Sequence, residues 1–120
     1  MLSFEDDFKK KYDINERINQ STNLKIKFVD RIPVIIYKSK KSNNINEIDK
    51  NKFLIPKDFI VSQLHLIIRK RLKLDKDKAM FLLCNNCIIN NSYTINILYE
   101  KYKDNDGFLY ISYNTENAFG

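Results

Sequence analysis

The run Ile32-Pro33-Val34-Ile35-Ile36-Tyr37 decides the fold, because it holds consecutive apolar or aromatic residues with no charge among them. So dense a run predicts a deeply buried strand. Upstream, Leu24, Ile26 and Phe28 alternate with lysines, and this period of two extends the predicted strand back to Leu24. Pro33 has no N–H to donate, so it is expected at a sheet edge or where strand pairing is interrupted.

Two short amphipathic helices are predicted before this strand. Phe4 and Phe8 lie one helical turn apart, as do Ile14 and Ile18, and the two helices would meet near Asp13. Each helix then carries an apolar stripe that must pack against another element.

The longest helix is predicted after a polar loop at residues 39–44 and a second, short strand. Phe53-Leu54-Ile55 forms that strand, Pro56 ends it, and Asp58 is a suitable N-cap for the helix that follows. Apolar residues recur in this helix at spacings of three and four, namely Ile60, Val61, Leu64, Ile67, Ile68 and Leu72.

The next segment predicts a hairpin and a short helix. Asn85-Asn86 separates two apolar runs, and asparagine tolerates the positive φ that a two-residue turn requires. Asn91 or Ser92 is expected to cap a short helix that continues through Leu98 and Tyr99.

Asp106-Gly107 predicts a turn into a last strand over residues 108–113, after which the pattern is lost. The expected fold is α+β, with one long helix covering one face of a four-stranded mixed sheet, an arrangement called the β-grasp. We therefore expect a single domain, with a helical extension over residues 1–23, a β-grasp core over 24–113 and a flexible tail over 114–120.

Composition argues against an enzyme or a metalloprotein. His65 is the only histidine, and two glycines cannot build a phosphate-binding loop. Cys84 and Cys87 match a C-x-x-C spacing, but a structural zinc needs about four ligands and these cysteines flank a predicted turn. We expect no catalytic residue, no metal and no cofactor, and two free cysteines suited to a reducing cytoplasm.

The net charge of +6 favours acidic partners or anionic membrane surfaces, and no run of about 18 apolar residues predicts a spanning helix. Arg69-Lys70-Arg71 with Lys73 either stabilises the end of the long helix or docks a partner. A nucleic-acid interface would add Lys25 and Lys27 to this cluster. Nucleic acid is not an expected partner, because the interleaved aromatic residues are missing.

The short strand at residues 53–56 is apolar on both faces, although only one face can point at the long helix. The other face is either covered by the N-terminal helices or open. An open face beside a strand edge would form an apolar groove for an extended peptide that adds as a new strand. Arg31, Lys50 and Lys52 would rim this groove and favour acidic peptides.

Several segments share their order and spacing with one known family. They are Asp30-Arg31-Ile32-Pro33-Val34-Ile35, Lys52-Phe53-Leu54-Ile55-Pro56, Ile67-Ile68-Arg69-Lys70-Arg71, Phe81 with Asn85-Asn86, Leu98-Tyr99, Asp106-Gly107-Phe108-Leu109-Tyr110, and the end from Tyr113 to Phe119-Gly120. Together they resemble the autophagy-related protein 8 family of ubiquitin-like modifiers, which includes the GABARAP-like proteins. The resemblance covers nearly the whole chain and implies a ubiquitin-like β-grasp with two extra N-terminal helices.

For function, the resemblance implies conjugation through Gly120. Family members expose a glycine that an ATP-dependent activating enzyme adenylates, and a conjugating enzyme joins it to phosphatidylethanolamine after thioester transfer. A processing and deconjugating cysteine protease, motif-bearing cargo receptors and adaptors, and phosphatidylethanolamine membranes are the other expected partners. The protein would be cytoplasmic, and peripheral on autophagosomal membranes when lipidated, with a role in autophagosome formation.

The resemblance also implies site residues for binding an aromatic-x-x-aliphatic motif. The aromatic pocket corresponds to Leu24, Pro33, Lys52, Leu54 and Phe108. The aliphatic pocket corresponds to Phe53, Ile55, Pro56, Phe59, Leu64 and Ile67. Arg31 and Lys50 would meet acidic residues that flank the motif, and Arg71 and Phe119 would contact the processing or conjugating enzymes.

Three departures from the family pattern affect these expectations. Phe28-Val29 stands where Tyr-Pro is common, Gln20 replaces a usual acidic residue beside the aromatic pocket, and Ile89-Asn90 stands where proline is usual. Two alternatives stay open: a peptide-binding adaptor that is not conjugated, and a modifier of a plastid membrane if the source is an apicomplexan-like parasite.

Overall fold

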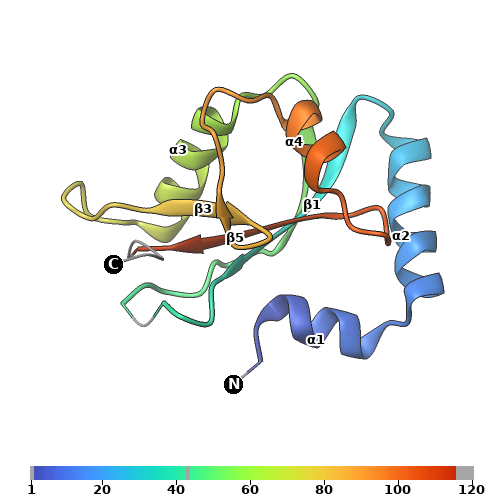
Figure 1. Cartoon of the computed structure of the whole chain (residues 1–120), viewed down its shortest axis with the longest axis horizontal. Helices are drawn as coiled ribbons and strands as arrows, with labels where there is room; N and C mark the ends of the chain where they lie inside the picture. Colours follow the sequence, from blue (N-terminus) through green and yellow to red (C-terminus); the bar gives the residue numbers. More distant parts are fainter. Residues whose placement is uncertain (1, 43, 116–120) are drawn as a thin grey trace.

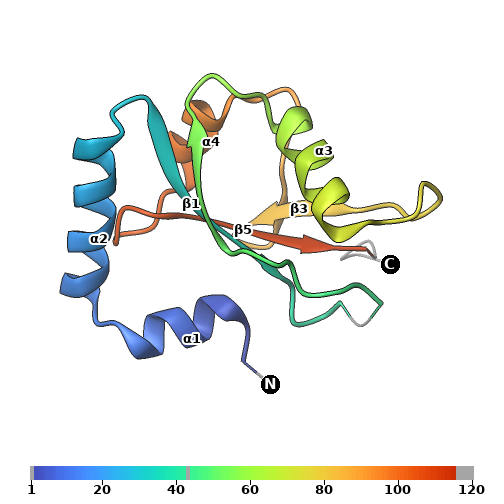
Figure 2. The ribbon, with the colours of Figure 1, turned by 180° about the vertical axis from the view of Figure 1, so that it is seen from behind.

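The computed structural model describes residues 2–42 and 44–115, which form an α+β fold (Figure 1). The helices are α1 (Phe4–Lys11), α2 (Ile14–Lys27), α3 (Val61–Leu72) and α4 (Ile95–Tyr102). The strands are β1 (Arg31–Lys38), β2 (Lys52–Pro56), β3 (Phe81–Cys84), β4 (Cys87–Ile88) and β5 (Leu109–Asn114). α3 and α4 lie on one side of the sheet and α1 on the other (Figures 1 and 2).

The sheet has the order β2-β1-β5-β3-β4, so β1 and β5 lie side by side at its centre. β1 pairs antiparallel with β2 and parallel with β5, and β3 pairs antiparallel with β5. This is the mixed β-grasp sheet that the sequence predicts. Among the described residues it has five strands instead of four, because the second arm of the hairpin, β4, pairs with β3.

β1 is apolar because both of its faces are buried. Val34 and Ile36 belong to a larger core under α3 and α4, together with Leu64 of α3. Ile35 points to the opposite face, where it packs in a smaller core with Phe8 of α1. The prediction of a deeply buried strand is therefore confirmed.

Pro33 lies one residue before β1 gains its second partner. A hydrogen bond from Ile36 N–H to Asn51 C=O (2.8 Å) sets the phase of the β1–β2 pair. Because main-chain groups alternate in direction along an antiparallel strand, the nitrogen of Pro33 faces the β5 side. Pairing with β5 begins only at Val34, so the missing N–H of Pro33 costs no ladder bond.

The two N-terminal helices begin with capping boxes. Ser3 accepts a hydrogen bond from Asp6 N–H at 3.1 Å, and Asp13 accepts one from Glu16 N–H at 2.8 Å. The side chains of Asp6 and Glu16 in turn accept hydrogen bonds from the main-chain N–H groups of the two cap residues. The predicted meeting of the helices near Asp13 is confirmed.

α2 continues through residues 24–27, where the alternation predicted a strand, and that prediction was wrong. Leu24 packs beside the smaller core, whereas Ile26 is 70% exposed, so the two side chains point in different directions. Positions 24 and 26 are apolar, but only Leu24 belongs to the buried face of the helix. The helical extension therefore ends at Lys27 and not at residue 23.

The helices α3 and α4 begin later than predicted. Ile60 precedes α3 and donates its N–H to the Gln63 side chain at 2.8 Å, while Asp58 lies in the preceding turn. Thr94 caps α4 by accepting from Ile97 N–H at 3.2 Å, in place of residue 91 or 92. An isolated antiparallel bridge between Ile60 and Thr94 keeps both segments extended up to these residues.

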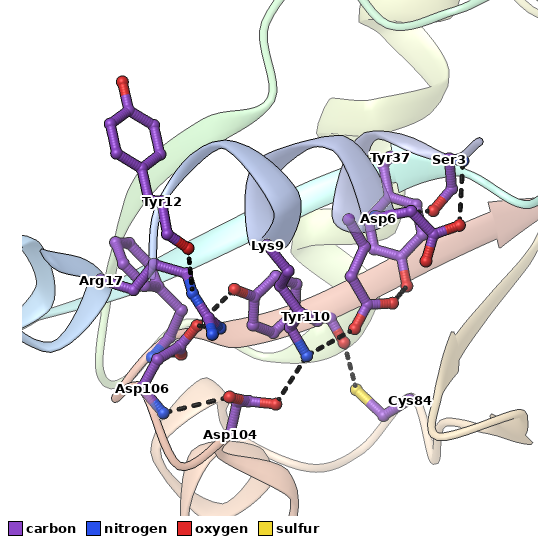
Figure 3. Close-up of polar contacts among 12 residues, drawn as sticks. Ser3, Asp6, Lys9, Tyr12, Arg17, Tyr37, Cys84, Asp104, Asp106 and Tyr110 are labelled. Carbon is purple, nitrogen blue, oxygen red and sulfur yellow. Dashed lines mark hydrogen bonds and ion pairs between the residues drawn. The ribbon is translucent and has the colours of Figure 1, made fainter. Parts of the chain in front are cut away.

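A buried ion pair holds α2 against the turn that precedes β5 (Figure 3). The Arg17 guanidinium donates to the Asp106 carboxylate at 2.8 Å, and Asp106 has no exposed surface. The Tyr110 hydroxyl and the Phe108 N–H donate to the same carboxylate. Burial and the bond to Asp106 raise the pKa of Tyr110, so its hydroxyl remains a donor over the physiological pH range.

A second polar cluster fastens α1 to the sheet (Figure 3). The Lys9 ammonium lies 2.9 Å from Asp104 and 3.0 Å from Glu5, and the Tyr37 hydroxyl donates to Glu5 at 2.6 Å. Burial opposes ionisation of Asp104, but hydrogen bonds from Lys9 and the Asp106 N–H, together with the nearby charges of Lys9 and Arg17, outweigh burial and lower the pKa of that carboxyl. Charged side chains therefore border the aromatic contacts of α1.

The hairpin between β3 and β4 turns at Asn85 and Asn86, whose φ angles are 49° and 65° as the prediction requires. Cys84 is buried and donates to the Tyr110 carbonyl at 3.3 Å, and burial raises the pKa of its thiol to about 12. Cys87 is exposed. Within the described residues no three His, Cys, Asp or Glu side chains are grouped to hold a metal.

We expect Asp106→Ala to lower the free energy of unfolding by about 3–5 kcal/mol, because Arg17 would be left charged and unpaired in a buried site. Urea denaturation followed by circular dichroism measures this change. Asp77→Ala removes an exposed carboxylate and should alter stability by less than about 0.5 kcal/mol. Equal stability of the two variants would show that the ion pair does not hold α2.

Iodoacetamide should alkylate Cys87 and spare Cys84 in the folded protein, because the buried Cys84 thiol stays protonated. The intact mass should show one added group, and Cys87→Ser should show none until the protein is denatured. Rapid alkylation of Cys84 in the folded Cys87→Ser chain would contradict its burial.

Candidate functional site

A groove of about 350 Å³ opens between α2, the free edge of β2 and the start of β5. It lies at the sheet edge because, among the described strands, β2 pairs only with β1. Its lining residues are Leu24, Arg31, Lys50, Lys52, Phe53, Leu54 and Phe108.

The structure brings most of the predicted aromatic pocket together in this groove. Leu24, Lys52, Leu54 and Phe108 line it, as do the rim residues Arg31 and Lys50. Pro33 does not, because it is buried in β1 as the Cα partner of Leu54. Phe53 also lines the groove, although the resemblance assigned it to the second pocket.

Phe108 gives the groove a rigid apolar wall. Its side chain is 1% exposed, and its ring meets that of Phe8 edge to face with centroids 5.6 Å apart. The N-terminal helices therefore do not close the groove; α1 supports Phe108 from behind, and α2 supplies Leu24. The outer face of the strand at residues 53–56 could have been covered by the N-terminal helices or left open, and the structure shows it partly open.

The groove is positively charged. Arg31, Lys50 and Lys52 line it, and no carboxylate is among its lining residues. The Lys52 ammonium lies 4.8 Å from the centroid of the Phe8 ring and 3.3 Å from the side-chain oxygen of Gln20. Because Gln20 is neutral, it orients Lys52 without cancelling its charge.

The outer edge of β2 turns main-chain N–H and C=O groups toward the groove and away from β1. Bonds from Ile36 N–H to Asn51 C=O and from Lys57 N–H to Asp30 C=O mark the paired positions of the β1–β2 ladder. Residues 52 and 54 fall at the alternate positions, so their N–H and C=O groups point away from β1.

One of these outward groups already has a partner. The Arg31 guanidinium donates to the Leu54 carbonyl oxygen at 3.1 Å. No periodicity or motif indicates this contact, because it depends on the register that sets Arg31 across from Pro56, two residues along β2 from Leu54.

The residues predicted for the aliphatic pocket belong to β2, to α3 and to the segment that joins them, which is the green part of the ribbon in Figure 2. Ile55 and Leu64 are buried in the larger core, and Phe53 and Phe59 pack against it while partly exposed. Ile67 is 36% exposed and Pro56 is half-buried. The accessible part is thus an apolar strip of Phe53, Pro56, Phe59 and Ile67.

Arg71 lies at the end of this strip. Its guanidinium is 5.2 Å from the centroid of the Phe53 ring and 3.6 Å from an Asp49 carboxylate oxygen. The Lys50 ammonium lies 5.1 Å from the centroid of the same ring. Phe53 is therefore bordered by two cations.

The described chain ends just past β5. Asn114 is the last residue of that strand and is buried, so the predicted tail begins one residue too early. Phe119 and Gly120 lie outside the described residues. Within those residues, no helix combines the length and the apolar composition needed to cross a bilayer.

Comparison with known proteins assigns the family. The sequence model of the family described as "Autophagy protein Atg8 ubiquitin like" matches residues 16–120. The chain is 43% identical to Autophagy-related protein 8 of Pichia angusta, covering 94% of this chain and 90% of the relative. It is 39% identical to Autophagy-related protein 8d of Arabidopsis thaliana, covering 94% and 93%.

A solved structure has the same architecture. The crystal structure of Trypanosoma brucei ATG8 superposes with a TM-score of 0.85 and 35% sequence identity, covering 94% of this chain and 97% of that one. The ubiquitin-like fold, the sequence motifs and these relatives agree. The chain belongs to the Atg8 family of autophagy-related ubiquitin-like proteins.

Proposed function

We propose that the protein is conjugated through Gly120 to phosphatidylethanolamine and recruits motif-bearing partners through the groove beside β2. The groove carries the proposal for binding, because it combines an apolar wall, an open strand edge and three cations. Such a site suits an extended acidic peptide that adds to the sheet as a strand. Family membership supports the proposal for conjugation.

The spacing of an aromatic-x-x-aliphatic motif fits the two candidate pockets. In an extended peptide, side chains three residues apart point to opposite sides. Leu24 and Phe108 lie with the smaller core on one side of the sheet, whereas Phe53 and Phe59 pack against the larger core on the other. A strand added to β2 would then present its aromatic residue to the groove and its aliphatic residue to the strip.

The proposed conjugation needs enzymes from outside this chain. ATP would convert the Gly120 carboxylate to a mixed anhydride with release of pyrophosphate, and a cysteine thiolate of the activating enzyme would displace AMP. After transfer to the conjugating enzyme, the lipid amine would attack the thioester and form an amide. Glycine suits these steps because it has no side chain to hinder attack at its carbonyl.

We place further contacts of the processing and conjugating enzymes at Arg71 and Phe119. Arg71 is exposed at the end of α3, where a carboxylate of a partner could replace its contact with Asp49. The lipidated protein would be peripheral on autophagosomal membranes, in exchange with a cytoplasmic pool.

A peptide with an acidic flank and an aromatic-x-x-aliphatic motif should bind wild-type protein, and Leu54→Ala should weaken binding about tenfold by removing a wall of the groove. Isothermal titration calorimetry measures the affinity. Leu54 is preferable to Phe108 as a target, because Phe108 is 1% exposed and its truncation would also disturb the core. Leu66→Ala, on the exposed side of α3, is the control, and a loss equal to that of Leu54→Ala would contradict the proposed pocket.

Purified activating and conjugating enzymes of the autophagy system, ATP and liposomes containing phosphatidylethanolamine should convert the protein to a faster-migrating lipidated form. Removal of Gly120 should abolish this product, and Gly120→Ala should reduce it sharply. Peptide binding should persist in both variants. A wild-type chain that binds peptide but is never conjugated would identify an adaptor instead of a modifier.

A further inference from the structure

We propose that Arg31 competes with incoming peptides for the open edge of β2, so that a peptide binds well only if it carries a carboxylate that can take over the guanidinium. This inference rests on the proposed peptide binding at the groove. In addition to attracting acidic peptides by its charge, Arg31 would then be an obstacle that neutral peptides must overcome.

The competition follows from the direction of one carbonyl group. Leu54 lies at a position of β2 where N–H and C=O point away from β1, toward the site of an added strand. The Arg31 guanidinium occupies that carbonyl oxygen at 3.1 Å. A peptide strand in register with β2 would bring its own N–H to the outward side of this oxygen, where the guanidinium already lies, so the strand has to displace Arg31.

Once displaced, the Arg31 guanidinium has no carboxylate already paired with it among the described residues. The ion pairs found between described residues involve other cations, and none includes Arg31. A neutral peptide therefore exchanges a charge-assisted hydrogen bond for an ordinary one. A glutamate or aspartate within about two residues of the entering N–H would accept the guanidinium, and such pairs are often bidentate.

Lys50 and Lys52 cannot substitute for Arg31 in this role. Their ammonium groups lie over aromatic rings, Lys50 at 5.1 Å from the Phe53 centroid and Lys52 at 4.8 Å from the Phe8 centroid. They attract acidic peptides without blocking the edge. Removing Arg31 should therefore change the affinities for neutral and acidic peptides in opposite directions. Removing a cation that only attracts would lower the affinity for acidic peptides alone.

Two peptides that differ only by Glu→Gln beside the motif test the proposal by calorimetry. Arg31→Ala should bind the neutral peptide about threefold more tightly, because the edge is released. The same variant should bind the acidic peptide about threefold more weakly, because an exposed ion pair is lost. Arg31 is exposed, so the substitution leaves both cores intact.

Lys57→Ala is the matched control. Lys57 is exposed and lines a neighbouring hollow together with Arg31, but it is not among the residues that line the groove. This variant should bind the acidic peptide slightly more weakly and the neutral peptide as tightly as the wild-type protein does. If Arg31→Ala weakens or preserves binding of the neutral peptide, the competition is refuted while the groove stands. If neither peptide binds wild-type protein, the proposed binding function fails, and the inference fails with it.

Discussion

The carboxylate of Asp106 is the point on which the arrangement of the N-terminal helices depends. It is fully buried, and it joins Arg17 of α2 to Tyr110 of β5 and to the turn between α4 and β5. A buried charge is tolerated only when it is paired and hydrogen-bonded, and here a guanidinium, a phenol and a main-chain N–H meet that need. The position of α2, and with it of Leu24 in the groove, follows from this contact.

The groove exists because one sheet edge is left open. An exposed strand edge is a risk, since it can pair with the edge of another molecule. Lysines at positions 50 and 52 reduce that risk by repulsion between copies, and Arg31 occupies an outward acceptor of β2. The same charges that keep two copies apart would draw an acidic peptide in, so protection of the edge and selection of partners have one physical basis.

Periodicity was sufficient for the elements whose burial is one-sided or complete. β1, α3, the Asn85-Asn86 turn and the last strand all follow from apolar spacing and from residues that tolerate positive φ. It was misleading at residues 24–27, where an apolar residue on the exposed face of α2 imitated a strand. The helix starts at Val61 and Ile95 were missed, because they depend on the bridge between Ile60 and Thr94, which joins segments that are distant in sequence.

The candidate site was also only partly predictable from the sequence. Family resemblance, and not periodicity, selected Leu24 and Phe108, and the structure brings both to the groove. The pairing of Arg31 with the Leu54 carbonyl could not be predicted, because it needs the strand register and the path of a long side chain. Asp106 looked like an ordinary turn residue, since its role depends on Arg17, which lies 89 positions away.

The parallel pairing of β1 with β5 also governs how the chain matures during synthesis. β1 is made early, but its second partner is the last strand of the described chain, and the anchor of α2 lies in the turn just before that strand. Until β5 has left the ribosome, one edge of β1 is unpaired, α2 has no Asp106 and the groove has no Phe108 wall. Contacts this far apart in sequence delay folding. A nascent chain would therefore offer no binding groove to partners, and recruitment could begin only once translation of the domain is essentially finished.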